Sequence, residues 1–220
     1  MKLFFTNIIS FIHPEGWKFA AIFLAASIAL SFLWMPLAIL GYALTFFVVW
    51  FFRDPERVTP SIPKAVFSPA DGVICLIDDA LPPPESGLDP VLMRRVCVFM
   101  NVFNVHVNRS PIKGRVQKIA YIKGSFLNAS LDKASEKNER NALVIEGEDQ
   151  AKIVVVQIAG LIARRILSFI EPGHDLLSGE RFGLIRFGSR VDVYLPQGSQ
   201  INCELKQKVV AGETILASLS

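Results

Sequence analysis

A serine follows a glycine inside a segment that otherwise reads as one β-strand, in the stretch RFGLIRFGSRVDVYLP at residues 181–196. Gly188 is a poor strand former, and the ordinary interpretation of such a step is a β-bulge. Ser189 also lacks the strand-to-helix turn that exposes the nucleophile of an α/β-hydrolase. The carbonyl that precedes Ser189 is within its reach, so a nucleophilic serine here is expected to attack its own chain.

An aspartate and a histidine elsewhere in the chain have the chemistry to activate that hydroxyl. Asp71 lies in SPADG, where the default interpretation is a turn whose aspartate caps its own backbone. His106 lies in FNVHVNRSP, and a lone histidine in such a run is more often a structural residue. Together the three side chains form the components of a relay, in which the carboxylate orients the imidazole and the imidazole takes the hydroxyl proton. We therefore predict Ser189, His106 and Asp71 as the catalytic group.

The elements that must position these residues are predominantly β-strands. From about residue 60 the chain consists of short apolar runs bounded by Gly, Pro, Asn and Asp, which predicts a mainly β, sandwich-like or barrel-like single domain. In VDVYL, apolar residues alternate with Asp192 and Tyr194, so we expect one buried face and one solvent face. LPPPESGLDP is expected to be a loop, and GSFLNASLDKASEKNER a loop or a short helix. The predicted strands are VFSPADGVICLI, RRVCVFMNVFNVHV, GRVQKIAYIKG, NALVIEG, AKIVVVQIA, RRILSFI, GLIRFGSRVDVYL and TILASL.

An apolar segment without any charge extends from Phe19 to Phe52. One straight helix of this length would be roughly 51 Å long at about 1.5 Å per residue, whereas the hydrocarbon core of a bilayer is about 30 Å thick. Pro36 lies near the middle, where it can end or kink a helix. The segment therefore predicts a hydrophobic helical hairpin that spans or enters a membrane. A cleaved signal peptide fits less well, because the run begins late and has no small-residue cleavage site at its end.

Basic residues flank the apolar segment on both sides, which predicts that both ends face the cytoplasm. These residues are Lys2 and Lys18 before the segment and Arg53, Arg57 and Lys64 after it. We therefore expect a membrane-associated hairpin and exit linker at residues 1–59, a β-rich catalytic domain at residues 60–220, and a location at the cytoplasmic side of the cell membrane.

The composition restricts the classes of partner. The net charge of +3 is too small to indicate a nucleic-acid partner, although a mildly basic face suits an anionic lipid surface. Cys75, Cys97 and Cys203 have no metal-site spacing, and each lies in an apolar β-like stretch. We expect three buried, reduced thiols and no metal.

Several of these motifs together resemble phosphatidylserine decarboxylase in its short, membrane-anchored form. They are SPADG, a strand histidine followed by NRSP, the NER of residues 138–140, and GERFGLIRFGSRVDVYLP. The resemblance covers nearly the whole chain. It implies a proenzyme that cuts itself between Gly188 and Ser189, with the serine becoming a covalent pyruvoyl group and no metal or diffusible cofactor being required. The keto carbonyl of this group would condense with the primary amine of phosphatidylserine to an imine with loss of water, and the carbonyl conjugated with that imine would accept the electrons released as carbon dioxide leaves. Reprotonation and hydrolysis would then give phosphatidylethanolamine.

The resemblance also assigns roles to single residues. Ser189 matches the self-cleavage serine, His106 the histidine that activates it and Asp71 the carboxylate that orients the histidine. Arg140 in NER could meet the phosphate or carboxylate of the substrate, or be a solvated charge in a loop. Phe103 is a departure, because longer family members carry a second histidine at this position. The role of that histidine in protonating the product therefore does not transfer to this chain.

The resemblance implies phosphatidylserine and membrane lipid as partners. We expect the large fragment (residues 1–188) and the small fragment (residues 189–220) to stay associated, and the sequence leaves open whether the protein forms a homo-oligomer. A membrane-anchored, lipoyl-like adaptor is the alternative, because SPADGVI and VVAGETIL resemble the glycine-centred turns of such modules. An adaptor would remain one chain. A pyruvoyl decarboxylase of a soluble amino acid is a nearer alternative, but it would not explain the anchor.

Overall fold

A computed structural model describes residues 11–124, 138–160, 165–186 and 189–220, and these divide into two compact units at Glu56 and Arg57. The segment that the sequence predicted as a loop or short helix lies largely outside the described residues, as does Gly188. The division falls three residues before the boundary expected at residue 60.

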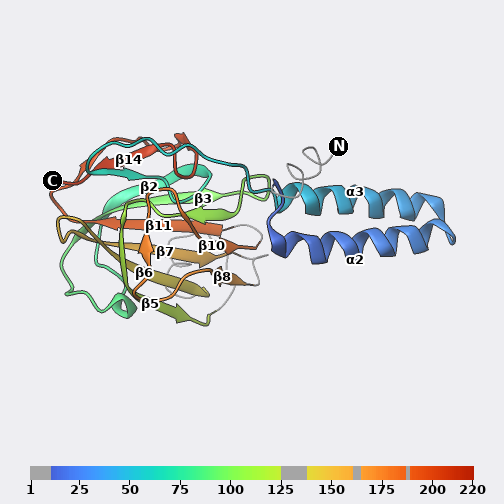
Figure 1. The fold of residues 1–220 in the computed structure, drawn as a ribbon, viewed down its shortest axis with the longest axis horizontal. Helices are drawn as coiled ribbons and strands as arrows, with labels where there is room; N and C mark the ends of the chain where they lie inside the picture. The colour runs from blue at the N-terminus through green and yellow to red at the C-terminus, as the bar shows by residue number, and fades with distance from the viewer. Residues whose placement is uncertain (1–10, 125–137, 161–164, 187–188) are drawn as a thin grey trace. The chain divides into compact units, whose positions relative to one another are not determined.

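The N-terminal unit contains two helices, α2 (Pro14–Ser31) and α3 (Met35–Phe51), which lie side by side (Figure 1). His13 caps α2 by accepting a hydrogen bond from the Glu15 amide, and Pro36 stands in the first turn of α3, where a proline is tolerated. The helices approach closely where the residues are small, since a Cβ on Gly41 would lie 2.5 Å from Ser27 Oγ. The break between the helices confirms the predicted hairpin topology. Neither described helix combines the length and the apolarity needed to cross a membrane.

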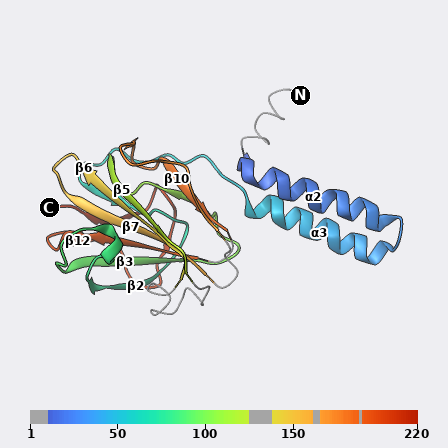
Figure 2. The ribbon, with the colours of Figure 1, turned by 90° about the horizontal axis from the view of Figure 1, so that it is seen from below.

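The second unit is mainly β and contains a curled, half-barrel-like sheet (Figure 2). This antiparallel sheet has the strand order β13-β2-β3-β11-β7-β6-β5-β9, and two three-stranded sheets, β4-β10-β8 and β1-β14-β12, accompany it. The strands of the large sheet are β2 (Gly72–Ala80), β3 (Met93–Met100), β5 (Gly114–Ile122), β6 (Arg140–Gly147), β7 (Lys152–Ala159), β9 (Asp175–Leu176), β11 (Ser189–Leu195) and β13 (Lys208–Val209). The smaller sheets use β1 (Ala65–Phe67), β4 (Val107–Arg109), β8 (Ile166–Ser168), β10 (Arg181–Ile185), β12 (Gln200–Ile201) and β14 (Ile215–Ser218).

Most of the predicted strands are present, although three of the predicted runs each form two strands. VFSPADGVICLI forms β1 and β2 around the SPADG turn, RRVCVFMNVFNVHV forms β3 and β4 around the turn at residues 101–104, and GLIRFGSRVDVYL supplies parts of β10 and β11. The two-residue strands β9, β12 and β13 were not predicted. They are too short to show a periodic pattern.

Strand β11 occupies the middle of the large sheet, between β3 and β7 (Figure 1). The prediction that one face of VDVYL meets water is wrong, because every residue of β11 is buried, with Asp192 0% and Tyr194 5% exposed. The second face of the sheet forms a smaller apolar cluster in which Tyr194 packs, and Leu88 packs against it. Leu88 belongs to the segment predicted as a loop, which contains the short 3-10 helix η1 (Pro84–Ser86). This segment thus helps to keep the second face from solvent.

The cysteines are all free thiols, as expected. Cys97 and Cys203 are buried, but the expected burial of Cys75 is wrong. Cys75 lies at a register shift between β2 and β3, where the regular alternation of inward and outward residues is interrupted.

Candidate functional site

Ser189 is the first residue of β11 and is completely buried. It lies opposite Met100 of β3 on one side and opposite Ala159 of β7 on the other. Its hydroxyl donates to the thioether of Met100, with Oγ and Sδ 3.4 Å apart. A thioether is a weak acceptor, so the hydroxyl is held in place without being strongly stabilised.

His106 lies just before β4 and is also completely buried. Its Nδ1 is 3.0 Å from the carbonyl oxygen of Asn104. A carbonyl oxygen can only accept a hydrogen bond, so in the neutral imidazole Nδ1 carries the hydrogen and Nε2 is the basic nitrogen. Ile185 of β10 donates its amide hydrogen to the His106 carbonyl at 3.2 Å, which fixes the histidine backbone beside the end of β10.

The turn before His106 is held by two asparagines. Asn104 Oδ1 accepts from the Asn101 amide at 2.9 Å, and Asn101 Oδ1 accepts from the Phe103 amide at 2.8 Å. These bonds fix the carbonyl that orients the histidine. The same turn leaves Phe103 66% exposed.

Asp71 is fixed through both of its carboxylate oxygens. Oδ2 accepts from Arg57 Nη2 at 2.9 Å, and Oδ1 accepts from the amide of Ala211 at 2.8 Å. The turn that carries Asp71 is attached to β4, because the Arg109 amide donates to the Pro69 carbonyl at 2.9 Å. The structure thus brings the SPADG turn and the strand after His106 together, while a direct link between the carboxylate and the imidazole stays a prediction.

Arg140 is not a solvated loop charge, because it begins β6 and forms an ion pair with Glu85 of η1. The pair joins η1 to the sheet, which gives the side chain a structural role. Its two neighbours in NER also serve the backbone: Asn138 Nδ2 donates to the Ala159 carbonyl, and Glu139 Oε1 accepts from the Ile166 amide. Substrate recognition by Arg140 stays a prediction.

A buried ion pair follows directly after Ser189, and the sequence analysis missed it. Arg190 donates to both carboxylate oxygens of Asp192, with Nε–Oδ1 at 2.7 Å and Nη2–Oδ2 at 2.8 Å. Burial acts to lower the pKa of Arg190, but the adjacent carboxylate outweighs it and raises the pKa above its ordinary value. The only signal in the sequence was the spacing, since side chains two residues apart lie on the same face of a strand.

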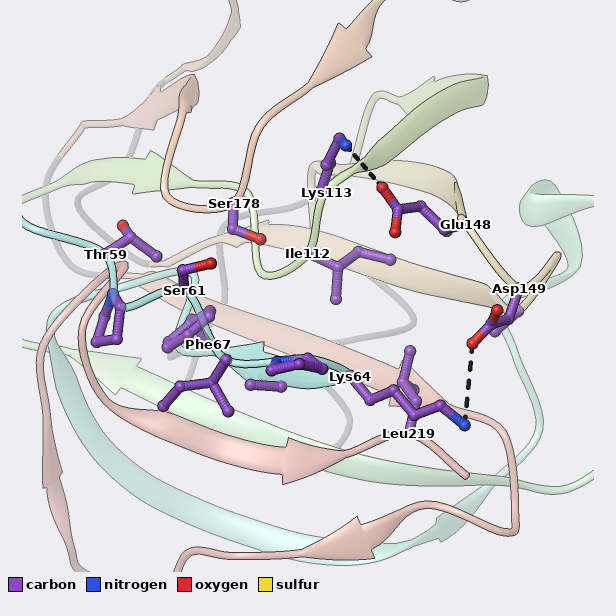
Figure 3. A pocket seen from close by; sticks show the side chains of 16 residues that line it. Thr59, Ser61, Lys64, Phe67, Ile112, Lys113, Glu148, Asp149, Ser178 and Leu219 are labelled. Carbon is purple, nitrogen blue, oxygen red and sulfur yellow. Dashed lines mark hydrogen bonds and ion pairs between the residues drawn. The ribbon is translucent and has the colours of Figure 1, made fainter.

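A cavity of about 580 Å³ lies away from these residues, between the segment at residues 59–65, the turn at residues 147–149 and Leu219 (Figure 3). Ion pairs of Lys64 with Asp149 and of Lys113 with Glu148 lie at this cavity. None of the predicted site residues lines it. Across the described part of the chain, no group of three or more His, Cys, Asp or Glu side chains is placed to hold a metal ion.

Comparison with known proteins gives consistent matches. The family model described as phosphatidylserine decarboxylase matches residues 44–217. The chain is 55% identical over 207 residues to the phosphatidylserine decarboxylase proenzyme of Ruegeria pomeroyi, with 94% of each protein covered. It is also 55% identical to the proteins of the same name from Cereibacter sphaeroides and Beijerinckia indica subsp. indica, where the match covers 94% of this chain and 90% and 88% of theirs.

Proposed function

Because the chain belongs to the phosphatidylserine decarboxylase family, we propose that it converts phosphatidylserine to phosphatidylethanolamine in phospholipid biosynthesis. The observation that carries this proposal is the match over nearly the whole chain to proteins named as proenzymes of this activity. A serine buried at the start of the central strand gives the proenzyme a residue to process.

Maturation is proposed to begin with attack of Ser189 Oγ on the carbonyl of Gly188, which moves the acyl group from nitrogen to oxygen. Elimination then releases the carboxylate of Gly188, and hydrolysis of the remaining dehydroalanine with release of ammonia leaves a pyruvoyl group at residue 189. The surroundings of Ser189 fit a pyruvoyl group. The group is small and uncharged, and the adjoining Met100 and Ala159 are buried and largely apolar. When formed, the group would supply an electrophilic keto carbonyl for the substrate amine and a conjugated system that accepts the electron pair released with carbon dioxide. Exclusion of water by the buried strand protects this carbonyl from side reactions.

His106 is proposed as the general base for the Ser189 hydroxyl. Its Nε2 is the nitrogen that can take a proton, because the Asn104 carbonyl engages Nδ1. Asp71 is proposed to support the histidine electrostatically, with its own orientation maintained by Arg57 and Ala211. In this arrangement the tautomer of the histidine is set by a backbone carbonyl.

The two fragments are proposed to stay associated after cleavage. The small fragment would contain β11, β12, β13 and β14. Strand β11 pairs with β3 and β7 along both edges, so separation would expose two strand edges and the apolar core between them. This supports a mature enzyme in which both fragments contribute to one sheet.

The helical unit is proposed to associate with the cytoplasmic side of the cell membrane. Large apolar side chains on and between α2 and α3 are exposed, including Phe32 at 85%, Leu33 at 81% and Phe46 at 70%. An exposed apolar surface of this kind favours contact with lipid or with another apolar surface. A lipid substrate gives such an anchor a purpose, which a soluble amino acid would not.

Release of carbon dioxide from carboxyl-labelled phosphatidylserine tests the activity directly. The purified full chain in mixed micelles is expected to release label from the lipid and not from free serine, and Ser189→Ala is expected to release none. Release from free serine alone would favour the soluble amino acid as substrate. Release from neither compound by a fully cleaved protein would contradict the proposed activity.

Deletion of residues 1–52 tests the role of the helical unit. The proposed relay lies wholly in the second unit, so the shortened chain is expected to cut itself but to act poorly on lipid in bilayers. Short-chain phosphatidylserine in detergent is expected to restore much of the rate, because this substrate can reach the site without the anchor. Failure of the shortened chain to process would show that the helices belong to the catalytic fold.

A further inference from the structure

Three carboxamide side chains form a buried chain of hydrogen bonds beside Ser189. Asn141 Nδ2 donates to Gln157 Oε1 at 3.0 Å, and Gln157 Nε2 donates to Asn108 Oδ1 at 2.8 Å. The three residues belong to β6, β7 and β4 and are at most 2% exposed. Buried amides cost desolvation that apolar side chains would avoid, so a chain of three within a β-sheet core indicates a purpose other than stability.

The register of the large sheet places this amide chain close to Ser189. Ser189 pairs with Ala159, and Gln157 lies two residues earlier on the same strand, so both residues face the same side of the sheet. Gln157 in turn lies opposite Asn141 of β6. Gly183 of β10 covers this position, and a Cβ there would lie 2.8 Å from Gln157 Nε2, so the glycine leaves room for the amide between the layers.

The direction of the amide chain is fixed by its contact with a backbone carbonyl. Asn108 Nδ2 lies 3.4 Å from the Pro69 carbonyl oxygen, which can only accept. Asn108 must therefore present its NH₂ group to Pro69 and its oxygen to Gln157. The donor end of the chain is the NH₂ of Asn108. The acceptor end is Asn141 Oδ1, a buried atom with no hydrogen-bond partner among the described residues.

The NH₂ group of Asn108, which is the donor end of the amide chain, and the Ser189 hydroxyl both contact Met100 Sδ. Met100 Sδ is 3.4 Å from Ser189 Oγ and 3.8 Å from Asn108 Nδ2. Both contacts of the Asn108 NH₂ group are long, and one of them is to a weak acceptor. The NH₂ group therefore has only distant acceptors, and one of them is the thioether that also accepts from Ser189.

We propose that Asn108 donates a hydrogen bond to the oxygen that becomes negatively charged during self-cleavage. This inference rests on the proposed maturation of Ser189. In that step Ser189 Oγ loses its proton to the base and bonds to the preceding carbonyl carbon, whose π electrons move to the carbonyl oxygen. The intermediate then breaks its C–N bond, the Ser189 nitrogen takes the proton, and an ester remains. A donor pre-oriented by Gln157 and Asn141 stabilises the negative oxygen without rearrangement.

The test compares Asn108→Ala, Asn108→Ser and Asn108→Asp with the parent chain. Full-length chains are made by cell-free synthesis in detergent, and cleavage is followed by intact mass. Loss of one such donor slows a reaction roughly 100- to 1000-fold, so Asn108→Ala is expected to cut itself slower by about this factor. Asn108→Ser retains a hydrogen-bond donor, so its cleavage rate is expected to lie between those of the parent chain and Asn108→Ala. Asn108→Asp is nearly isosteric but is expected to be the slowest, because it places an acceptor or a charge beside the developing anion.

Two controls separate this role from a structural one. Asn141→Ala removes an amide at the far end of the chain and is expected to slow cleavage less than about tenfold. Hydroxylamine cleaves the ester, and it is not expected to restore the rate of Asn108→Ala, because the defect precedes ester formation. Melting temperatures of all variants identify loss of fold. If Asn108→Ala does not fold, the proposal is tested by whether Asn108→Ser cuts itself faster than Asn108→Asp.

Three results would overturn the proposal. They are parent-like cleavage by folded Asn108→Ala, faster cleavage by Asn108→Asp than by Asn108→Ser, or full rescue by hydroxylamine. An uncleaved parent chain would instead refute the maturation on which the proposal rests. The two failures are therefore distinguishable in one experiment.

Discussion

The two faces of β11 treat their polar side chains differently. On the face towards the main core, the Ser189 hydroxyl has a thioether as its acceptor, at 3.4 Å. On the opposite face, Arg190 and Asp192 form two short, charge-assisted hydrogen bonds and are both at most 1% exposed. Ser189 thus has only a weak hydrogen-bond acceptor, whereas the next residue, Arg190, is held by a strong ion pair.

Under the proposed maturation, the contrast would let one strand be both reactive and rigid. A weak acceptor leaves the hydroxyl available for attack, since little must be broken before it moves. The ion pair one residue later, and the strands β3 and β7 on either side, hold the backbone in place. We infer that the second face stabilises the strand so that the first face can react.

Removing the reactive group is the largest change that can be made on the first face. Ser189→Ala is expected to abolish cleavage completely, because no nucleophile remains. His106→Ala is expected to leave the chain whole or nearly so, because the base is lost. Gel separation of the fragments measures both effects. A His106→Ala chain that cuts itself at the parent rate would remove this histidine from the mechanism.

Asp71→Asn is expected to slow cleavage by orders of magnitude while preserving the fold. The substitution removes the negative charge that is proposed to support His106. The chain offers Asp79→Asn as a control for loss of a carboxylate, because Asp79 is a half-exposed residue paired with Arg94. Parent-like kinetics in Asp71→Asn, measured beside this control, would exclude a role for Asp71.

Breaking the ion pair on the second face is expected to affect stability more than chemistry. In a Ser189→Ala background, which stays one chain, Asp192→Asn should lower the free energy of unfolding by about 3–5 kcal/mol because it strands the Arg190 charge. Urea unfolding of the detergent-solubilised protein measures this change. Replacing both partners, as Arg190→Met with Asp192→Leu, should recover most of the loss. A double variant as unstable as Asp192→Asn would show that the pair is not the source of the effect.

Alkaline pH should produce the most gradual effect, again on the second face. Burial raises the pKa of the Cys97 thiol well above its ordinary value and raises the pKa of Tyr194 to about 12. The unfolded chain ionises first, so stability should be constant below about pH 9 and fall from pH 9 towards 12, by at most about 1.4 kcal/mol per pH unit for each group. Urea midpoints across this range measure the fall, and Tyr194→Phe should reduce it above pH 10. An unchanged fall in that variant would contradict the assignment to Tyr194.

The sequence predicted most of the strands and drew attention to Ser189 because both depend on local patterns. Alternating apolar residues mark a strand, and a Gly-Ser step within one is a local anomaly. The order of the strands was not predictable in the same way, because register depends on partners far along the chain. The amide chain of Asn108, Gln157 and Asn141 was therefore missed, since these residues are neighbours only in the folded sheet.

The error at Asp192 and Tyr194 has a related cause. Alternation of polar and apolar residues indicates an exposed face only where nothing covers that face. Here Leu88 packs against the apolar cluster of the second face, and the Arg140–Glu85 pair holds the adjoining η1 against the sheet. The loop-like composition of LPPPESGLDP gave no indication that this segment covers a face of the sheet.

Intact mass of the protein purified from active membranes tests the central claim most directly. The account predicts two fragments, residues 1–188 and 189–220, of about 21 and about 3.5 kDa at roughly 110 Da per residue. The small fragment should begin with a keto group in place of an amine. Full-length chain alone, recovered with undiminished decarboxylase activity, would contradict it.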